Sequence, residues 1–160
     1  MRSLRIEPGP GQESVWDYPR PPIVSWYSGR VRVVHGGVTI ADTTKALRVL
    51  ETSQPPAFYL PPTDVAVELL QRSSATTWCE WKGAANYWDL ADVSGVAWSY
   101  EQPVADFAAI TDHLAFYAQK VDECWVDEER VLPNPGTFYG GWITSSVVGP
   151  FKGAPGSQGW

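Results

Sequence analysis

The sequence predicts a mainly β fold of antiparallel strands with one or two short helices, followed by a C-terminal tail rich in glycine, proline and aromatic residues. Turn-forming residues recur every ~8 to 12 residues between short runs of β-branched and aromatic residues, as in all-β domains. Only the segment from Thr63 to Leu70 has a clear helical start. Strands should therefore dominate the domain.

The first predicted element is a hairpin, because Gly36-Gly37 separates two runs rich in β-branched residues, 30–35 and 38–42. A two-glycine loop between such runs is a strong hairpin signal. The next run, 45–50, leaves two alternatives open. The Asp-Thr-Thr segment before it could cap a short helix, or the run could be a strand that ends near Glu51.

Prolines border the following elements. We expect a strand at 57–60, between Pro55-Pro56 and Pro61-Pro62, since proline lacks the backbone donor that a sheet needs. Thr63 then resembles a helix N-cap. The apolar spacing of 64–70 suits about two turns of helix.

The centre of the chain is predicted to form further strands. Segments 76–81 and 84–89 are rich in aromatic and β-branched residues on either side of Gly83, so two strands bent at this glycine are expected. Residues 96–100 form another predicted strand. One helical turn is expected at 106–110.

Later segments are less regular. Periodicity allows a strand or a helix at 113–117, whereas 123–131 is predicted to be a hairpin that turns at the acidic residues 127–129. No regular element is expected from Leu132 to Trp160. This extension would need buried aromatic area to be ordered. Its expected anchors are Phe138, Trp142, Phe151 and Trp160.

The composition indicates one globular domain and disfavours several functions. The 160 residues are 44% hydrophobic and include nine Trp, but no apolar run approaches the roughly 18 residues of a membrane helix. The net charge is −6 and the basic residues are scattered, whereas nucleic-acid binding draws on clustered Lys and Arg. We therefore expect no membrane and no nucleic-acid partner. The polar N-terminal arm, 1–22, has no secretory apolar stretch, which makes the cytoplasm the expected location.

The cysteines and histidines predict neither a metal site nor a cofactor. Cys79 and Cys124 lie far apart, and neither belongs to a CxxC pair, which does not suit structural zinc. A disulfide between them would be unusual in a reducing cytoplasm. His35 and His113 have no partner at ligand spacing.

Several short motifs follow one another in an order typical of a single family. They are Ala41-Asp42-Thr43, Glu51-Thr52, Phe58-Tyr59-Leu60-Pro61, Asp64-Val65, Thr77-Trp78-Cys79-Glu80-Trp81-Lys82-Gly83, Tyr87, Trp98-Ser99-Tyr100 and Phe116-Tyr117. Through them the chain resembles the domain of unknown function 427 family, with a core at 23–131 and an extension at 132–160. The family usually has a proline at the position of Glu80, so the local turn can differ here.

This resemblance implies a fold rather than an activity. The family is similar in architecture to β-tent proteins, which include methionine-R-sulfoxide reductases and the drug-binding domain of cereblon, so β-tent-like sheets and a strand at 113–117 are expected. The family has also been grouped with nucleotidyltransferases. That chemistry needs a glycine-serine phosphate loop and closely spaced aspartates for two metals. Neither pattern occurs, and this activity is not expected.

Three residues could carry chemistry: Cys79, Lys82 and Glu51. A thiolate is a good nucleophile once a nearby cation lowers its pKa, and Lys82 could supply that charge. Residues three apart on an unbroken strand face opposite sides, so Cys79 and Lys82 meet only if the chain bends near Gly83. Glu51 could pair with Lys82 and orient it, or move a proton. The alternatives are an inert core cysteine and a solvated acid at the end of an element.

Aromatic side chains could form the walls of a pocket around these residues. They offer flat apolar faces with polar tips, although aromatic residues at strand spacing more often form core. The candidates are Tyr59, Trp81, Trp98 and Tyr100.

The leading hypothesis is therefore a small-molecule enzyme, or the degenerate descendant of one, with a Cys/Lys/Glu pocket. Two other classes stay open. A non-catalytic module could recognise a planar or cationic ligand with its aromatic walls, as the cereblon resemblance suggests. A structural or assembly protein could dock on a partner, or form an oligomer, through the C-terminal extension.

Overall fold

The computed structural model describes residues 5–91, 93–136, 138–157 and 159–160. The fold is mainly β, as predicted, and every helical segment in these ranges is a short 3-10 turn. The elements in chain order are β1 (Glu13–Ser14), η2 (Val15–Asp17), β2 (Ile23–Trp26), β3 (Val31–His35), β4 (Val38–Thr43), β5 (Leu47–Leu50), β6 (Ala57–Tyr59), η3 (Pro62–Asp64), η4 (Val67–Leu69), β7 (Leu70–Cys79), β8 (Gly83–Leu90), β9 (Val93–Ser99), η5 (Ala105–Ile110), β10 (Ala115–Phe116), β11 (Glu123–Val126), β12 (Glu129–Arg130), β13 (Leu132–Pro133), β14 (Trp142–Ile143) and β15 (Val147–Val148).

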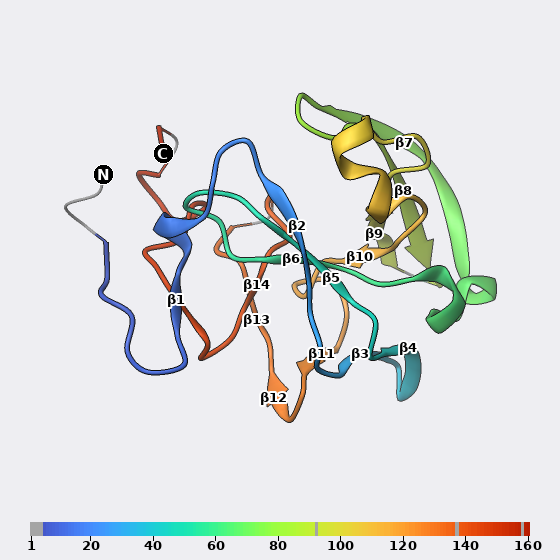
Figure 1. Ribbon diagram of the computed structural model, residues 1–160. Helices are drawn as coiled ribbons and strands as arrows, with labels where there is room; N and C mark the ends of the chain where they lie inside the picture. Colours follow the sequence, from blue (N-terminus) through green and yellow to red (C-terminus); the bar gives the residue numbers. More distant parts are fainter. Residues whose placement is uncertain (1–4, 92, 137, 158) are drawn as a thin grey trace.

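The larger sheets are antiparallel and have the strand orders β10-β9-β8-β7, β12-β11-β3-β4 and β2-β5-β6. In Figure 1 the sheet that contains β7 lies on one side of the molecule and both chain ends lie on the other, with β2, β5 and β6 between them. Two short pairs, β13-β14 and the parallel pair β1-β15, involve the C-terminal extension. The prediction that the extension has no regular element was therefore wrong, because its short strands find partners.

The strands predicted from turn chemistry are confirmed. Gly36 and Gly37 both have positive φ, 59° and 76°, as a tight turn between β3 and β4 requires. Segment 45–50, for which the sequence allowed a helix or a strand, contains strand β5. This strand pairs with β2 and β6 on its two sides. The hairpin at 123–131 forms from β11 and β12.

The helix predicted at 63–70 was wrong. The segment forms the two turns η3 and η4, and β7 begins at Leu70. Val65 makes a bridge to Ala41, and the backbone N–H of Ala66 donates to Ile40 O at 2.8 Å. These bonds to β4 use the backbone groups that a helix would need, and they bury the Val65 side chain.

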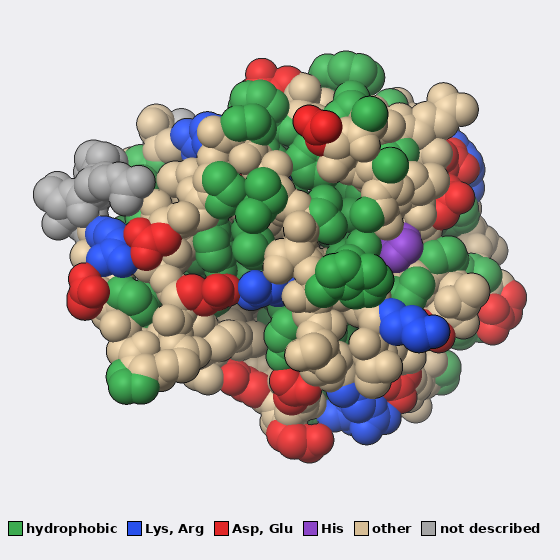
Figure 2. All heavy atoms as spheres, viewed as in Figure 1, with side chains coloured by type: hydrophobic (Ala, Val, Ile, Leu, Met, Phe, Trp, Pro, Cys, Tyr) green, Lys and Arg blue, Asp and Glu red, His purple; other side chains and the backbone are tan. Residues whose placement is uncertain are grey.

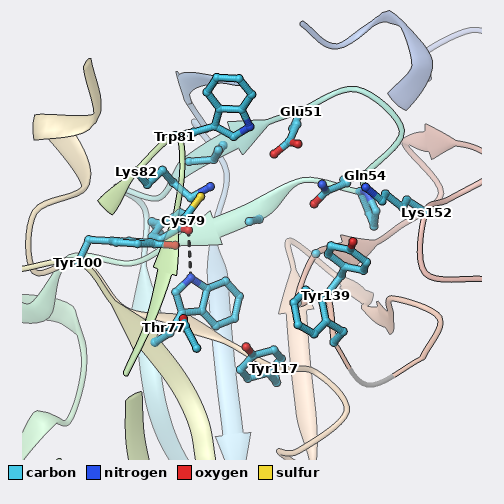
Figure 3. A pocket seen from close by; sticks show the side chains of 18 of the residues that line it. Glu51, Gln54, Thr77, Cys79, Trp81, Lys82, Tyr100, Tyr117, Tyr139 and Lys152 are labelled. Atoms are coloured by element: carbon cyan, nitrogen blue, oxygen red, sulfur yellow. Dashed lines mark hydrogen bonds between the residues drawn. The ribbon is translucent and has the colours of Figure 1, made fainter. Parts of the chain in front are cut away.

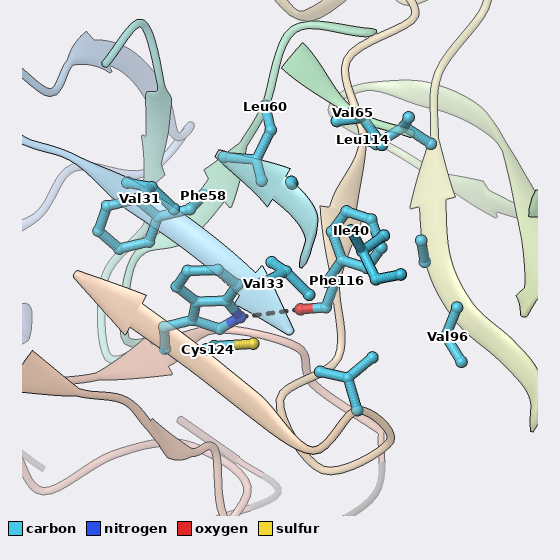
Figure 4. Packing of buried hydrophobic residues seen from close by; sticks show 14 of the residues in the cluster. Val31, Val33, Ile40, Phe58, Leu60, Val65, Val96, Leu114, Phe116 and Cys124 are labelled. Carbon is cyan, nitrogen blue, oxygen red and sulfur yellow. Dashed lines mark hydrogen bonds between the residues drawn. The ribbon is translucent and has the colours of Figure 1, made fainter. Parts of the chain in front are cut away.

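The main core collects side chains from β3, β4, β6, β9, β10 and β11 around the indole of Trp142. Trp142 is 1% exposed, stacks on Phe58 with ring centroids 5.2 Å apart, and donates from Nε1 to Phe116 O at 2.8 Å. Figure 4 shows this bond among the packed residues. Trp142 is thus the predicted anchor that ties the extension to the sheets.

The two ends of the chain pack on each other in a cluster of their own. Val15, Trp16 and Tyr18 are buried there with Val147, and the rings of Trp16 and Trp160 lie 5.3 Å apart. The predicted polar arm, 1–22, is therefore not wholly polar and exposed, because Val15, Trp16 and Tyr18 are buried. Phe151 also packs on this cluster, whereas Phe138 is 78% exposed and does not anchor the extension.

The surface in Figure 2 has apolar side chains gathered near its middle, with acidic and basic side chains interspersed around the edge. Over the described ranges, the structure contains no helix long and apolar enough to cross a membrane.

Replacing Trp142 with Ala should destabilise the domain by about 3–5 kcal/mol, since it empties a core site and leaves the Phe116 carbonyl without its donor. The matched control is Phe138→Ala in the same extension, where about 0.5 kcal/mol or less is expected because the ring is exposed. Urea denaturation of both variants measures the difference. Similar losses for the two would contradict the anchoring role of Trp142.

Candidate functional site

A pocket of about 630 Å³ lies between β5, β6, the β7–β8 hairpin, β9 and the C-terminal extension. Figure 3 shows its side chains converging from these separate segments. All seven residues that the sequence nominated line it. They are Glu51, Tyr59, Cys79, Trp81, Lys82, Trp98 and Tyr100.

The β7–β8 hairpin brings Cys79 and Lys82 to the same pocket. Cys79 ends β7 and pairs with Gly83, the first residue of β8, so Lys82 lies in the turn between the strands. Gly83 has φ +110°, a conformation that side chains disfavour. Lys82 O accepts a hydrogen bond from Val104 N at 2.9 Å, which fixes the turn. The bend that the sequence required is therefore present.

The Lys82 side chain is largely enclosed and lies beside two aromatic rings. It is 8% exposed, and its ammonium lies 5.9 Å from the ring centroids of both Tyr100 and Phe107. Within the described residues, no carboxylate lies at ion-pair distance from Nζ and no acceptor forms a hydrogen bond with it. Contacts with two aromatic rings replace only part of the hydration that the ammonium loses.

The predicted pairing of Glu51 with Lys82 was wrong. Glu51 Oε2 instead lies 4.0 Å from Arg20 Nε. The register explains this: Ile23 of β2 pairs with Leu50 of β5, so the residues just before β2 lie beside the residue just after β5. Glu51 lines the same pocket but is held from the other side.

Buried phenols supply further hydrogen-bond donors. Burial raises the pKa of Tyr59, Tyr100 and Tyr117 above the ordinary value, so their hydroxyls stay protonated at neutral pH. Tyr59 Oη accepts from Trp98 Nε1 at 3.0 Å. In the described part of the chain, neither Tyr59 nor Tyr100 has an acceptor for its own hydroxyl proton.

Sequence reasoning missed the wall that the C-terminal extension contributes. Tyr139, Gly140, Gly141 and Lys152 line the pocket, yet no residue of the extension was among the predicted site residues. A Cβ on Gly140 would collide with the Trp98 ring, and one on Gly141 would collide with Pro55. The two adjacent glycines therefore let the backbone of the extension pack closely against Trp98 and Pro55. This glycine pair was the sequence feature that could have indicated the close contact.

The two cysteines have different surroundings, and both are free. Cys79 is partly exposed in the pocket. Cys124 is 2% exposed in the main core, where burial raises its pKa to about 12. Across the described ranges, no three His, Cys, Asp or Glu residues gather where they could hold a metal ion.

A family model described as a domain of unknown function (DUF427) matches residues 23–127, well over half of the chain. The chain belongs to this family. No curated protein matches the sequence. The DUF427 match contains Glu51, Cys79, Lys82 and the aromatic walls, whereas Tyr139 and Lys152 lie beyond it. The pocket is thus formed by the family domain together with a segment outside the match.

Iodoacetamide should alkylate the native protein at Cys79 and leave Cys124 intact. At pH 7.5 the Cys124 thiol is protonated and enclosed, because its pKa is raised to about 12. Peptide mass spectrometry should find one adduct in native protein and two after unfolding in urea. Equal modification of both cysteines in the native state would show that the burial of Cys124 does not protect it.

Proposed function

We propose that the pocket binds a small organic molecule through a negatively charged or carbonyl oxygen held at Lys82. The observation that carries this proposal is the Lys82 side chain, which is 8% exposed, lines the pocket and has no anionic partner among the described residues. The aromatic contacts contribute about 0.5–2 kcal/mol and leave the ammonium protons free to donate to an acceptor in the pocket. A ligand oxygen would supply the missing partner.

The neighbouring groups support an oxygen acceptor as the bound group. The hydroxyls of Tyr59 and Tyr100 have protons to donate, and both residues line the pocket with Lys82. A pocket end that offers mainly donors favours carboxylate, phosphate or carbonyl oxygens. The aromatic faces of Trp98 and Tyr117 suit a flat or apolar remainder.

The same arrangement disfavours the cationic ligand that an aromatic cage would otherwise suggest. Lys82 already lies over the Tyr100 ring, so a ligand cation there would meet a like charge. Assembly through the extension also loses support. Trp142, Phe151 and Trp160 pack within the chain, while Phe138 stays exposed.

Catalysis by Cys79 is a second candidate function, favoured by the presence of its thiol in the pocket that holds Lys82. The sulfur would form a bond to the carbonyl carbon of the ligand while the C=O π bond opens. The thiol proton would pass to the carbonyl oxygen. Lys82 would stabilise the negative charge that develops there, as an oxyanion hole does.

Replacing Lys82 with Met tests the binding proposal. Without ligand, Lys82→Met should change the stability of the protein by less than about 1 kcal/mol, because a side chain of similar length keeps the packing. Small carboxylates from formate to benzoate should raise the melting temperature of the wild type and not that of the variant.

Lys45→Met is the matched control, because Lys45 is exposed and does not line the pocket. This variant should respond to carboxylates as the wild type does. The binding proposal fails if the carboxylates leave the wild type unchanged or shift it and Lys82→Met equally.

The rate of Cys79 alkylation tests the catalytic candidate. Lys82→Met should slow the reaction with iodoacetamide severalfold, since the ammonium no longer favours negative charge in the pocket. Lys45→Met should leave the rate unchanged. If Lys82→Met abolishes carboxylate binding but keeps the alkylation rate, the pocket binds its ligand without a nucleophilic role for Cys79.

A further inference from the structure

We infer that Lys152 forms a second anion subsite, so that the ligand is a small organic molecule with a negatively charged group at each end. This inference rests on the proposed binding of an anionic oxygen at Lys82. It assigns a specificity-determining role to a residue that lies outside the matched family domain.

Lys152 lies where two cavities meet. It lines the pocket of about 630 Å³ and also a smaller one of about 180 Å³, and Phe138 and Tyr139 are shared by both. In Figure 3, Lys152 and Lys82 lie on opposite sides of the larger pocket. A ligand that reaches from one ammonium to the other would therefore cross its full interior.

The backbone around Lys152 is held firmly in place. Its N–H donates to Ser53 O at 2.7 Å, and its carbonyl accepts from Asn134 Nδ2 at 3.0 Å. Asn134 is 2% exposed. A Cβ on Gly153 would lie 2.5 Å from both the Asn134 amide and Pro135 O, so only glycine permits this close packing. The Cα of Lys152 is thus fixed, and its long side chain projects from a rigid position.

The ammonium of Lys152 also lacks a counter-charge. It lies 5.4 Å from the Tyr139 ring centroid, and no carboxylate in the described ranges is within ion-pair distance. Glu51 lines the wall between the two lysines in Figure 3, and Arg20 holds it at 4.0 Å. Its negative charge disfavours a third anionic group there. The charges therefore fit a ligand that is anionic at both ends and neutral or cationic in the middle.

Protection of Cys79 from iodoacetamide measures binding at this pocket directly. The probes are straight-chain dicarboxylates from succinate to suberate, each compared with the monocarboxylate of equal chain length. In the wild type, the best-fitting dicarboxylate should protect at about one tenth of the concentration that its monocarboxylate needs, equivalent to about 1.4 kcal/mol. Lys152→Gln should remove this preference and leave monocarboxylate protection unchanged.

Two variants separate this inference from the proposed function. Lys82→Met should abolish protection by both kinds of acid, whereas Lys45→Gln should change nothing. If Lys82-dependent protection occurs but dicarboxylates have no advantage, or keep it in Lys152→Gln, the second subsite is wrong and the Lys82 site stands. If no acid protects the wild type at all, both are wrong.

Discussion

The indole of Trp142 is the contact on which the outer parts of this domain depend. It lies inside the main core, stacks on Phe58 and donates to the Phe116 carbonyl, so the extension is attached at the centre of the sheets rather than at their surface. From this point the chain continues to β15, which pairs with β1, and to Trp160, whose ring packs on buried Trp16. The segments on either side of Trp142 also supply a pocket wall through Tyr139 and Lys152. One buried side chain thus links the packing of both termini to the shape of the candidate site.

The surroundings of Lys82 are what the proposed binding role would require. Lys residues are seldom as enclosed as Lys82, which is 8% exposed, and an apolar side chain of similar length would keep the same packing. Its position is nevertheless fixed by the tight turn at Gly83 and by the bond from Val104 N to its carbonyl. A rigid backbone that presents an unsatisfied charge is the arrangement expected of a preorganised site, because no ordering of the protein is then needed when the ligand arrives.

Local chemistry predicted the strands, and nonlocal pairing explains the failures. Gly36-Gly37 and the β-branched runs beside it specify a hairpin within a few residues, so this element could be read directly. The helix expected after Thr63 depended instead on whether Val65 and Ala66 would find a partner strand, which a short window does not reveal. The same limit applies to the site. Residue types identified Cys79, Lys82 and Glu51, but the partner of Glu51 depends on the β2–β5 register, which places Arg20 beside it.

The ion pair between Glu51 and Arg20 changes which charged groups are free to contact a ligand. In a Glu51–Lys82 ion pair the ammonium would already donate to a carboxylate. Lys82 would then be less able to bind a ligand oxygen. Because Arg20 arrives from outside the pocket, the carboxylate is balanced there and Lys82 remains available to the pocket interior. The Glu51 carboxylate also lies between two cationic positions of the pocket, Lys82 and Lys152. Specificity would then come from both attraction at the two ends and repulsion in the middle, which together discriminate more sharply than either alone.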